Sequence, residues 1–321
     1  MDSNSLINKP INQLNLYGYQ KYFELFIKLN ESKTLPKCIL LNGPKGLGKS
    51  TFAYHLSNYF LSKDEECGYS LDNFLINDNS NSYNFLLNKT HPNFYLIDFY
   101  KDLDKSIKIE QIRDLLIFAR KSTFSKNLKL ILIDNAEFLN LNSSNSLLKI
   151  LEEPPDNTIF LIVHDSAVKL LSTIKSRCSE FKIHFTFSQK REILIKILEQ
   201  YKFDLHLVDI LDEFYFDTPG NLIKYISILD KEKLNYKENK IECIDYFMEL
   251  YKKLKDPNLL NFISIFVTNY YNNLCIKNPL NQNLYFFNNF KIIQKLNEIK
   301  IYNSNEKSIF FSIKNLLTNE N

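Results

Sequence analysis

The chain has 321 residues, of which 45% are hydrophobic, enough to bury sizeable cores and to exclude an intrinsically disordered protein. At roughly 100–200 residues per domain, this length predicts two or three domains. Forty Lys and Arg residues against 37 Asp and Glu residues give a net charge of +3, which does not favour a surface coated for nucleic acid.

The five cysteines lie far apart and form no C-x-x-C pair, which predicts a reducing compartment and argues against disulfides and a zinc site. The opening residues, MDSNSLINKPINQ, do not resemble a signal peptide. No apolar run approaches the roughly 18 residues that span a bilayer. We therefore expect a soluble, cytoplasmic protein without a membrane partner.

Apolar runs alternate with helical patterns through the first half of the chain, which is typical of a parallel sheet covered by helices. The predicted strands are residues 38–43, 93–99, 128–134, 158–164 and 180–185. The predicted helices are residues 49–61, 107–121 and 143–153, with a short helix around 167–175. Segment 63–92 is polar and Asn-rich, and it is interpreted as an insertion loop.

After about Phe187 the strand pattern stops, and amphipathic helices are predicted at 188–202, 221–231, 244–254 and 262–274. This change predicts three parts. They are an α/β domain at 1–186, a small helical domain at 187–232 and a larger helical domain at 233–321.

The stretch GPKGLGKS matches the phosphate-binding motif G-x-x-x-x-G-K-[ST], with a predicted strand before it and a predicted helix after it. Three of the chain's six glycines fall in this loop, where glycine lets backbone N–H groups approach phosphates. A Gly-rich turn, or a loop of the right shape that no longer binds nucleotide, are the alternatives. The motif predicts these nucleotide-binding residues: Gly43, Pro44, Gly46, Leu47, Gly48, Lys49, Ser50 and Thr51.

Within this loop, Lys49 would supply charge to the β- and γ-phosphates, and Ser50 could bind Mg²⁺. The predicted strand at 128–134 ends in Asp134, and a carboxylate at a strand tip beside a phosphate loop can orient a magnesium ion. Read alone, Asp134 could instead cap a helix or a turn. The next residue is Asn135, whose amide cannot take a proton from water.

Seven segments together resemble the bacterial clamp-loader AAA+ subunits of DNA polymerase III, of the delta-prime type. The block LLKILEEPP, followed by a strand and then Ser-Arg-Cys, is the most specific of these matches. The order and spacing agree across roughly the first 185 residues. The segments are residues 16–20, 35–51, 91–98, 109–115, 130–140, 145–163 and 173–178.

The resemblance implies an AAA+ P-loop domain at 1–186, a helical lid at 187–232 and an all-α collar, used for oligomerisation, at 233–321. It implies ATP or ADP with Mg²⁺ as the ligand, and Ser50 and Asp134 as the metal-binding residues. It also implies that Arg177 is an arginine finger that reaches the γ-phosphate in a neighbouring subunit, because a guanidinium stays charged and presents paired donors. The alternative is a solvated surface arginine.

The chain departs from the family pattern at several positions. Asn135 stands where the hydrolysing gamma and tau subunits carry a glutamate, and Gly220 stands where they carry an arginine. His164 lies in the first sensor region, where it could contact phosphate, although a satisfied strand-end histidine is favoured. The cysteine cluster of the zinc modules is reduced to Cys67, so zinc is not expected.

These departures indicate a delta-prime-like subunit that binds Mg-nucleotide weakly or without efficient hydrolysis and has little or no ATPase activity alone. The implied partners are gamma/tau and delta subunits, the sliding clamp indirectly, and primed DNA through the assembled complex. Two alternatives remain: an active gamma/tau-type ATPase in which Glu137 replaces the missing base, and an unrelated P-loop enzyme such as a small-molecule kinase. Four basic residues could track DNA or form a solvated face: Arg113, Arg120, Lys121 and Lys126.

Overall fold

The computed structural model of the chain describes residues 9–98, 106–121, 128–203, 214, 217–234, 239–302 and 304–318. The chain divides into two compact units, each of which is described separately. Unit 1 contains Met1–Tyr201 and Phe216–Asn221, and unit 2 contains Lys202–Tyr215 and Leu222–Asn321. The division into nucleotide-binding, lid and collar domains stays a prediction.

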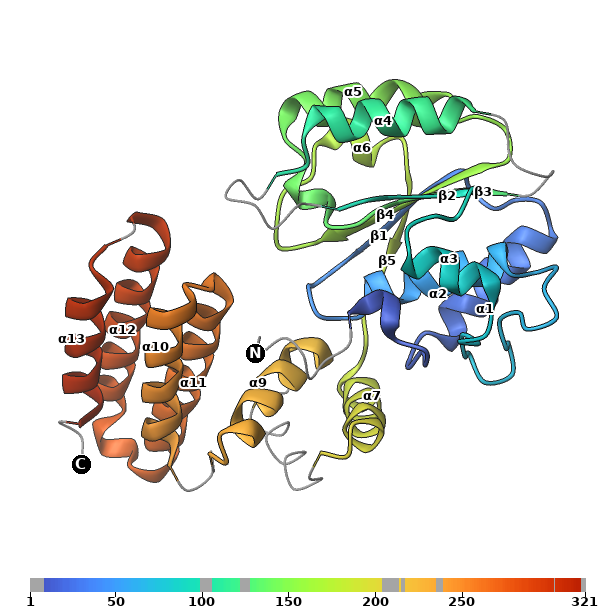
Figure 1. The fold of residues 1–321 in the computed structure, drawn as a ribbon. Helices are drawn as coiled ribbons and strands as arrows, with labels where there is room; N and C mark the ends of the chain where they lie inside the picture. Colours follow the sequence, from blue (N-terminus) through green and yellow to red (C-terminus); the bar gives the residue numbers. More distant parts are fainter. Residues whose placement is uncertain are drawn as a thin grey trace. The chain divides into compact units, whose positions relative to one another are not determined.

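A five-stranded parallel sheet lies at the centre of unit 1, in the order β2-β3-β4-β1-β5 (Figure 1). This arrangement confirms the predicted fold class. The register places Gly43 at the end of β1 beside Asp165 at the end of β4. The candidate functional residues that follow these strands therefore lie together at the carboxyl ends of the sheet. The strands are β1 (Cys38–Gly43), β2 (Phe94–Ile97), β3 (Lys129–Ile133), β4 (Thr158–Asp165) and β5 (Ser179–Lys182).

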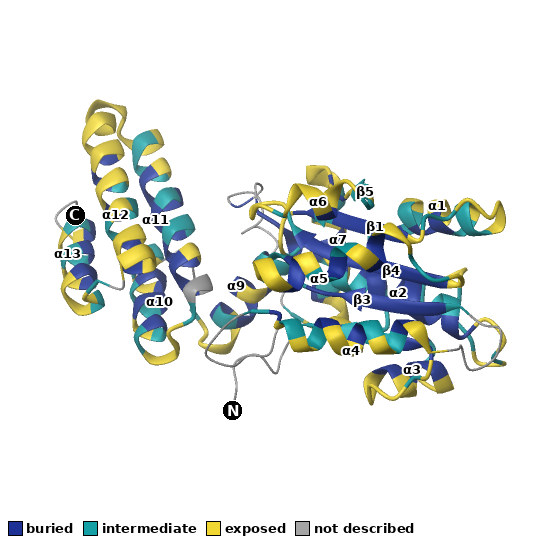
Figure 2. Ribbon diagram, turned by 90° about the horizontal axis from the view of Figure 1, so that it is seen from above, coloured by how far each residue is buried: buried dark blue, intermediate teal, exposed yellow. Residues whose placement is uncertain are grey.

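Alternating residues of the central strands point to opposite faces of the sheet, and each face has its own core. Figure 1 shows α1, α2 and α3 on one face, and α4, α5 and α6 on the other. The three inner strands are buried on both faces, as Figure 2 shows for β1, β3 and β4. The helices and short 3-10 turns are η1 (Pro10–Asn12), α1 (Gln20–Glu31), α2 (Lys49–Leu61), α3 (Asn81–Leu87), α4 (Ile109–Arg120), η2 (Ala136–Phe138), α5 (Leu141–Glu152), α6 (Ser172–Lys175) and α7 (Phe187–Gln200).

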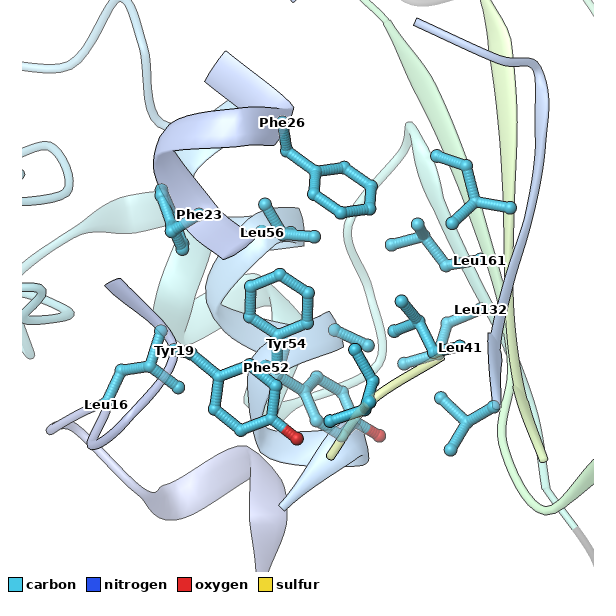
Figure 3. Close-up of a cluster of buried hydrophobic side chains, with 14 of the residues drawn as sticks. Leu16, Tyr19, Phe23, Phe26, Leu41, Phe52, Tyr54, Leu56, Leu132 and Leu161 are labelled. Carbon is cyan, nitrogen blue, oxygen red and sulfur yellow. The ribbon is translucent and has the colours of Figure 1, made fainter. Parts of the chain in front are cut away.

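An aromatic cluster fills the core between α1, α2 and the sheet (Figure 3). Tyr19 stacks on Phe52 with ring centroids 4.5 Å apart, and both side chains are buried. The Tyr19 hydroxyl donates to the carbonyl of Leu47 at 3.0 Å. This core therefore stabilises the phosphate loop through one buried hydrogen bond.

Two helices of unit 1 lie where none is predicted. Helix α1 follows the segment LYGYQ and buries Phe23 and Phe26. The segment at 63–92 is not entirely a loop, because α3 forms within it after a cap in which Ser80 accepts from the backbone N–H of Tyr83. Burial of Tyr83 and Leu86 explains why this short, Asn-rich stretch is helical.

The described part of unit 2 is helical, as predicted for the C-terminal part of the chain. Helix α9 begins in unit 1 and continues into unit 2, where Tyr225 meets Phe262 and Phe266 of α11. Helices α10 to α13 lie side by side (Figure 1). The helices are α9 (Pro219–Lys231), α10 (Lys240–Leu254), α11 (Pro257–Lys277), α12 (Gln282–Tyr302) and α13 (Glu306–Thr318), with the 3-10 turn η4 (Pro279–Asn281) before α12.

Among the described residues, no helix combines the length and the apolar character needed to cross a membrane.

Candidate nucleotide-binding site

The phosphate loop connects β1 to the first turn of α2, as the motif predicts. Gly46 and Gly48 have φ angles of +87° and +84°, a region that side chains with a Cβ rarely adopt. At Gly43, a Cβ would lie 2.6 Å from the carbonyl oxygen of Ile183. Each of the three glycines therefore has a conformational or steric reason to be there.

The outer side of the loop packs directly against the start of α9. Thr218 donates from its hydroxyl to the carbonyl of Lys45 at 2.9 Å, and the backbone N–H of Gly220 donates to the carbonyl of Gly46 at 2.8 Å. A Cβ on Gly220 would lie only 2.6 Å from that same carbonyl oxygen. We call these contacts between residues 45–46 and 218–220 the loop–α9 contact. Because they use carbonyl groups, they leave loop N–H groups available for phosphate.

Lys49 is buried at the base of the loop, and its ammonium donates to the carbonyls of Gly43 at 2.6 Å and Pro44 at 2.7 Å. An ammonium has three N–H donors, so one remains for a phosphate oxygen. Burial lowers the pKa of Lys49 to about 8. Nearby carboxylates, first that of Asp165, oppose this shift and help to keep the ammonium charged.

Asp134 follows β3, and its carboxylate accepts the hydroxyl hydrogen of Ser50 at 2.7 Å. Burial raises the pKa of the Asp134 carboxyl to about 6, against the effect of the Ser50 hydrogen bond. The charge of Asp98 adds to the rise. Two hard oxygens, one on each side chain, lie together beside the loop, which is the donor type that Mg²⁺ takes. These residues therefore fit a magnesium-nucleotide.

No carboxylate occupies the position directly after Asp134. Asn135 has a φ of +56°, and its amide donates to the carboxylate of Asp98 at 2.9 Å. Glu137 lies two residues further on and accepts from the backbone N–H of Asp165 at 3.2 Å. Its negative charge nevertheless acts on the pKa of both Lys49 and Asp134, so Glu137 belongs to the site.

Only one of the two ring nitrogens of His164 has a hydrogen-bond partner among the described residues. Its Nδ1 lies 3.1 Å from the amide oxygen of Asn42, whereas its buried Nε2 has no hydrogen-bond partner in the described part of the chain. Burial lowers the pKa of the imidazole, which favours the neutral ring. The expectation of a satisfied strand-end histidine is therefore correct for one ring nitrogen and not for the other.

Arg177 does not contact the loop of its own subunit in any hydrogen bond of the described residues. Its guanidinium forms an ion pair with Glu152 at the end of α5, and it donates from Nη1 to the carbonyl of Thr173 at 2.9 Å. Its side chain is 29% exposed, compared with 49% for Glu152. Asp134 thus contacts the residues of the phosphate loop, whereas Arg177 forms its hydrogen bonds elsewhere in the described structure.

The remaining predicted residues have simpler places. Leu47 is buried, and Thr51 is partly buried in the first turn of α2. Arg113, Arg120 and Lys121 are exposed at α4, whereas Lys126 lies outside the described residues. Cys67 is exposed, and the described ranges contain no cluster of three or more His, Cys, Asp or Glu residues that could hold a metal by themselves.

The contacts of Asp98, Glu137, Asp165 and Glu152 are not apparent from the sequence motifs. Asp98 is near the end of the predicted strand at 93–99 and Asp165 directly follows the one at 158–164, so a search for polar residues at strand ends could have found them. Glu152 lies in the LEEPP block, but its contact with Arg177 joins positions 25 residues apart. No local pattern predicts that contact.

A parallel sheet in the order β2-β3-β4-β1-β5, with a phosphate loop after the inner strand β1, defines a P-loop α/β domain of the AAA+ type. A family model described as "DNA polymerase III, delta subunit" matches residues 18–186 of this chain. The chain belongs to that family, and the predicted family is confirmed.

Curated relatives carry related names. A DNA polymerase III subunit delta' of Pseudomonas aeruginosa is 33% identical over 143 residues, which are 43% of this chain and 40% of that protein. A delta' subunit of Buchnera aphidicola subsp. Baizongia pistaciae is 25% identical over 242 residues, covering 71% and 68%. A gamma subunit of Buchnera aphidicola subsp. Schizaphis graminum is 30% identical over 148 residues, covering 44% and 41%. The match thus spans about two fifths of the Pseudomonas relative.

Among solved structures, a gamma-subunit-related protein of Thermotoga maritima aligns with 91% of this chain and 97% of its own chain. The identity is 15% and the TM-score is 0.44, so this likeness carries no argument about function.

Proposed function

We propose that this chain is the delta-prime-type subunit of a DNA polymerase III clamp loader in the cytoplasm. In this proposal it binds Mg-nucleotide without efficient hydrolysis and supplies Arg177 to the nucleotide site of a neighbouring subunit. The observation that carries the proposal is the combination of an intact loop with Asn135 after Asp134. The family match and the delta' names of relatives support the clamp-loader part.

Nucleotide would be held by the phosphate loop, Lys49 and the pair Ser50 and Asp134. Loop N–H groups and the free N–H of Lys49 would bind phosphate oxygens, while the loop–α9 contact keeps the carbonyls turned away. Ser50 and Asp134 would bind the magnesium ion. A bound magnesium ion would neutralise phosphate charge and, by attracting the carboxylate, return the pKa of Asp134 toward its ordinary value.

Hydrolysis would be slow because the site lacks a positioned base. The amide of Asn135 has no basic lone pair, and its N–H is used by Asp98. Glu137 supports the second candidate function, an active gamma/tau-type ATPase, because its charge acts on Lys49 and Asp134. Its hydrogen bond with the backbone of Asp165 holds the carboxylate at the end of β4, which disfavours that role.

Assembly would use unit 2. Helix α12 buries one set of apolar residues within the unit, yet Leu284, Phe286, Phe287 and Phe290 are more than half exposed. A helix that is apolar on two faces is expected to bury both, and we propose the corresponding helical unit of a neighbouring subunit as the partner. Phe286→Ser together with Phe290→Ser should keep the helical content and prevent co-purification with gamma/tau and delta subunits. Full co-purification of this variant would exclude α12 as the interface.

DNA would be contacted through the assembled complex. Arg113 and Arg120 lie on the exposed face of α4 with Lys121 directly after them. Positive charge of this kind suits backbone contacts without base readout.

Calorimetry and turnover measurements test the nucleotide part of the proposal. The wild-type chain should bind Mg-ATP or Mg-ADP, and Lys49→Ala should lose most of the heat of binding because the phosphate loses its buried cation. Lys45→Ala removes an exposed ammonium from the same loop and is the matched control. Rapid turnover by the purified chain would favour the gamma/tau function, and no heat from the wild type would indicate a loop that no longer binds nucleotide.

The arginine part requires the reconstituted complex. Arg177→Ala should leave nucleotide binding by this chain unchanged and lower the DNA-stimulated ATPase of the complex. An arginine finger in trans contributes roughly 10³–10⁵ in rate at a single site, but the fall should be smaller here because other sites keep their own arginines. Arg177→Lys should not restore the rate, since an ammonium lacks paired planar donors. A wild-type rate in Arg177→Ala would contradict the role.

A further inference from the structure

The guanidinium of Arg177 is held inside its own subunit by groups on two helices. Its Nε donates to Glu152 Oε1 at 2.8 Å, and Nη2 donates to the same oxygen. Its Nη1 donates to the carbonyl of Thr173 at 2.9 Å and lies 3.4 Å from the hydroxyl of Ser176. Glu152 ends α5, whereas Thr173 and Ser176 belong to α6 and its C-cap, so the hold depends on how these helices pack.

These bonds use the donors that an arginine finger would need. A guanidinium binds an oxyanion most strongly with two parallel N–H groups along one edge. The edge formed by Nε and Nη2 is occupied by Glu152. On the edge formed by Nη1 and Nη2, the two N–H groups of Nη1 have two acceptors, the carbonyl of Thr173 and the hydroxyl of Ser176. Arg177 therefore cannot offer a free paired edge to a phosphate while it stays in this position.

We propose that Glu152 restrains Arg177 in the unengaged subunit and releases it when a neighbour presents a triphosphate. This inference rests on the proposed role of Arg177 in trans. An exposed ion pair favours its closed form by a factor of only about five or less, so the restraint is weak enough to be exchanged. A terminal phosphate carries more negative charge than one carboxylate and has more acceptor oxygens, so the exchange is favourable once the subunits meet.

Glu153 provides a matched control beside Glu152. It is exposed, and no hydrogen bond or ion pair of the described residues joins it to Arg177. Glu152→Gln and Glu153→Gln remove the same charge at neighbouring positions, and both keep the size of the side chain. A difference between them isolates the contact with Arg177 from the general effect of a lost carboxylate.

The first test measures the restraint in the free chain. Phenylglyoxal modifies arginine side chains, and peptide mass spectrometry gives the rate at Arg177 relative to that at Arg113, which is exposed on α4. Glu152→Gln should raise the relative rate at Arg177 about threefold to fivefold. Glu153→Gln should leave it unchanged. Equal rates in the wild type and Glu152→Gln would overturn the proposal, whatever the fate of the proposed function.

The second test uses the reconstituted complex. If Glu152 competes with the neighbouring phosphate, Glu152→Gln should raise the DNA-free ATPase rate up to about fivefold and leave the DNA-stimulated plateau nearly unchanged. The double variant Glu152→Gln, Arg177→Ala should behave as Arg177→Ala does. A lower stimulated rate in Glu152→Gln would overturn the proposal, because Glu152 would then present the arginine instead of restraining it. If Arg177→Ala alone leaves the DNA-stimulated ATPase rate unchanged, the proposed function is contradicted. The labelling experiment then still decides whether Glu152 restrains Arg177.

Discussion

The phosphate loop and the arginine element are built from opposite kinds of interaction. The loop is fixed by positive φ angles, by backbone carbonyls and by a buried ammonium. Arg177 is fixed by a carboxylate on a neighbouring helix, and both side chains are accessible to solvent. A charged ligand could replace this ion pair directly.

This difference separates two tasks. A group that binds a ligand works best when its position is fixed. Burial and backbone hydrogen bonds fix that position, and a change in it costs much free energy. A group that acts on another molecule must leave its own subunit, and an exposed ion pair allows that at little cost. Substitutions in the loop should therefore have large effects on stability, whereas those at Arg177 should have small ones.

The largest effect is expected from Gly220→Arg. A Cβ at this position would lie 2.6 Å from the carbonyl oxygen of Gly46, so α9 would have to move away from the loop. Overpacking and the loss of a backbone hydrogen bond should together lower the free energy of unfolding by about 2–4 kcal/mol. Nucleotide affinity should fall as well, because the moved helix no longer holds the carbonyl of Gly46. Urea unfolding and calorimetry measure the two effects.

Lys231→Arg is the control for this variant, because it places the same side chain at an exposed position at the end of the same helix. It should change the free energy of unfolding by no more than about 0.5 kcal/mol. If Gly220→Arg unfolds at the same urea concentration as Lys231→Arg, the loop–α9 contact does not stabilise the protein.

A smaller effect of opposite sign is expected from Asp134→Asn. The pKa of Asp134 is about 6 in the folded chain, against about 3.9 in an unfolded one, so the folded state binds more protons between these values. The Asp134 carboxyl therefore lowers the free energy of unfolding of the wild type as the pH rises from about 4 to 6. The lowered value persists at neutral pH. Without nucleotide, Asp134→Asn should stabilise the chain by about 1–2 kcal/mol at pH 7.5, since its amide oxygen can still accept from Ser50.

The measurement is the difference in free energy of unfolding between the wild type and Asp134→Asn from pH 4 to 8. The difference should grow between pH 4 and 6 and then stay level. With Mg-nucleotide present, the sign should reverse, because the variant loses a magnesium-binding residue. A constant difference across the pH range would show that the Asp134 carboxyl titrates normally.

The smallest effect on stability is expected from Arg177→Ala. The loss of its partly exposed ion pair should change the free energy of unfolding by less than about 1 kcal/mol, in contrast to the loop variants. Thermal unfolding of the free chain checks this value. A loss above about 2 kcal/mol would mean that Arg177 joins α5 to α6 structurally, and the distinction between the two regions would disappear.

Sequence patterns predict the parts of this molecule whose signals are local. The strand ending at Gly43, the motif around Lys49 and the apolar run before Asp134 each lie within a few residues, and the structure places them as expected. The pattern in α1 was also available, since Phe23 and Phe26 stand at helical spacing with Ile27 beside them. Helix α3 was hidden by its composition, because burial of two side chains outweighs its polar residues.

Contacts between distant segments could not be predicted from one sequence. The loop–α9 contact joins Lys45 to Thr218, which are 173 residues apart. Nothing around Glu137, which lies in η2, indicates that its carboxylate meets the backbone of Asp165 at the end of β4. Such contacts follow from the packing of the whole sheet and its neighbouring helices. The motif identifies Lys49 from the sequence, but these contacts determine which carboxylates lie close enough to change its pKa.

The loop–α9 contact also sets an order of events during synthesis. All five strands are complete once Lys182 has been added, yet the partners of the loop carbonyls arrive about 40 residues later. At about 5–20 residues per second, this gap lasts roughly 2–8 s on the ribosome. In that interval the five strands can pair, whereas the loop carbonyls still lack their partners, so the ability to retain nucleotide would arise late in synthesis.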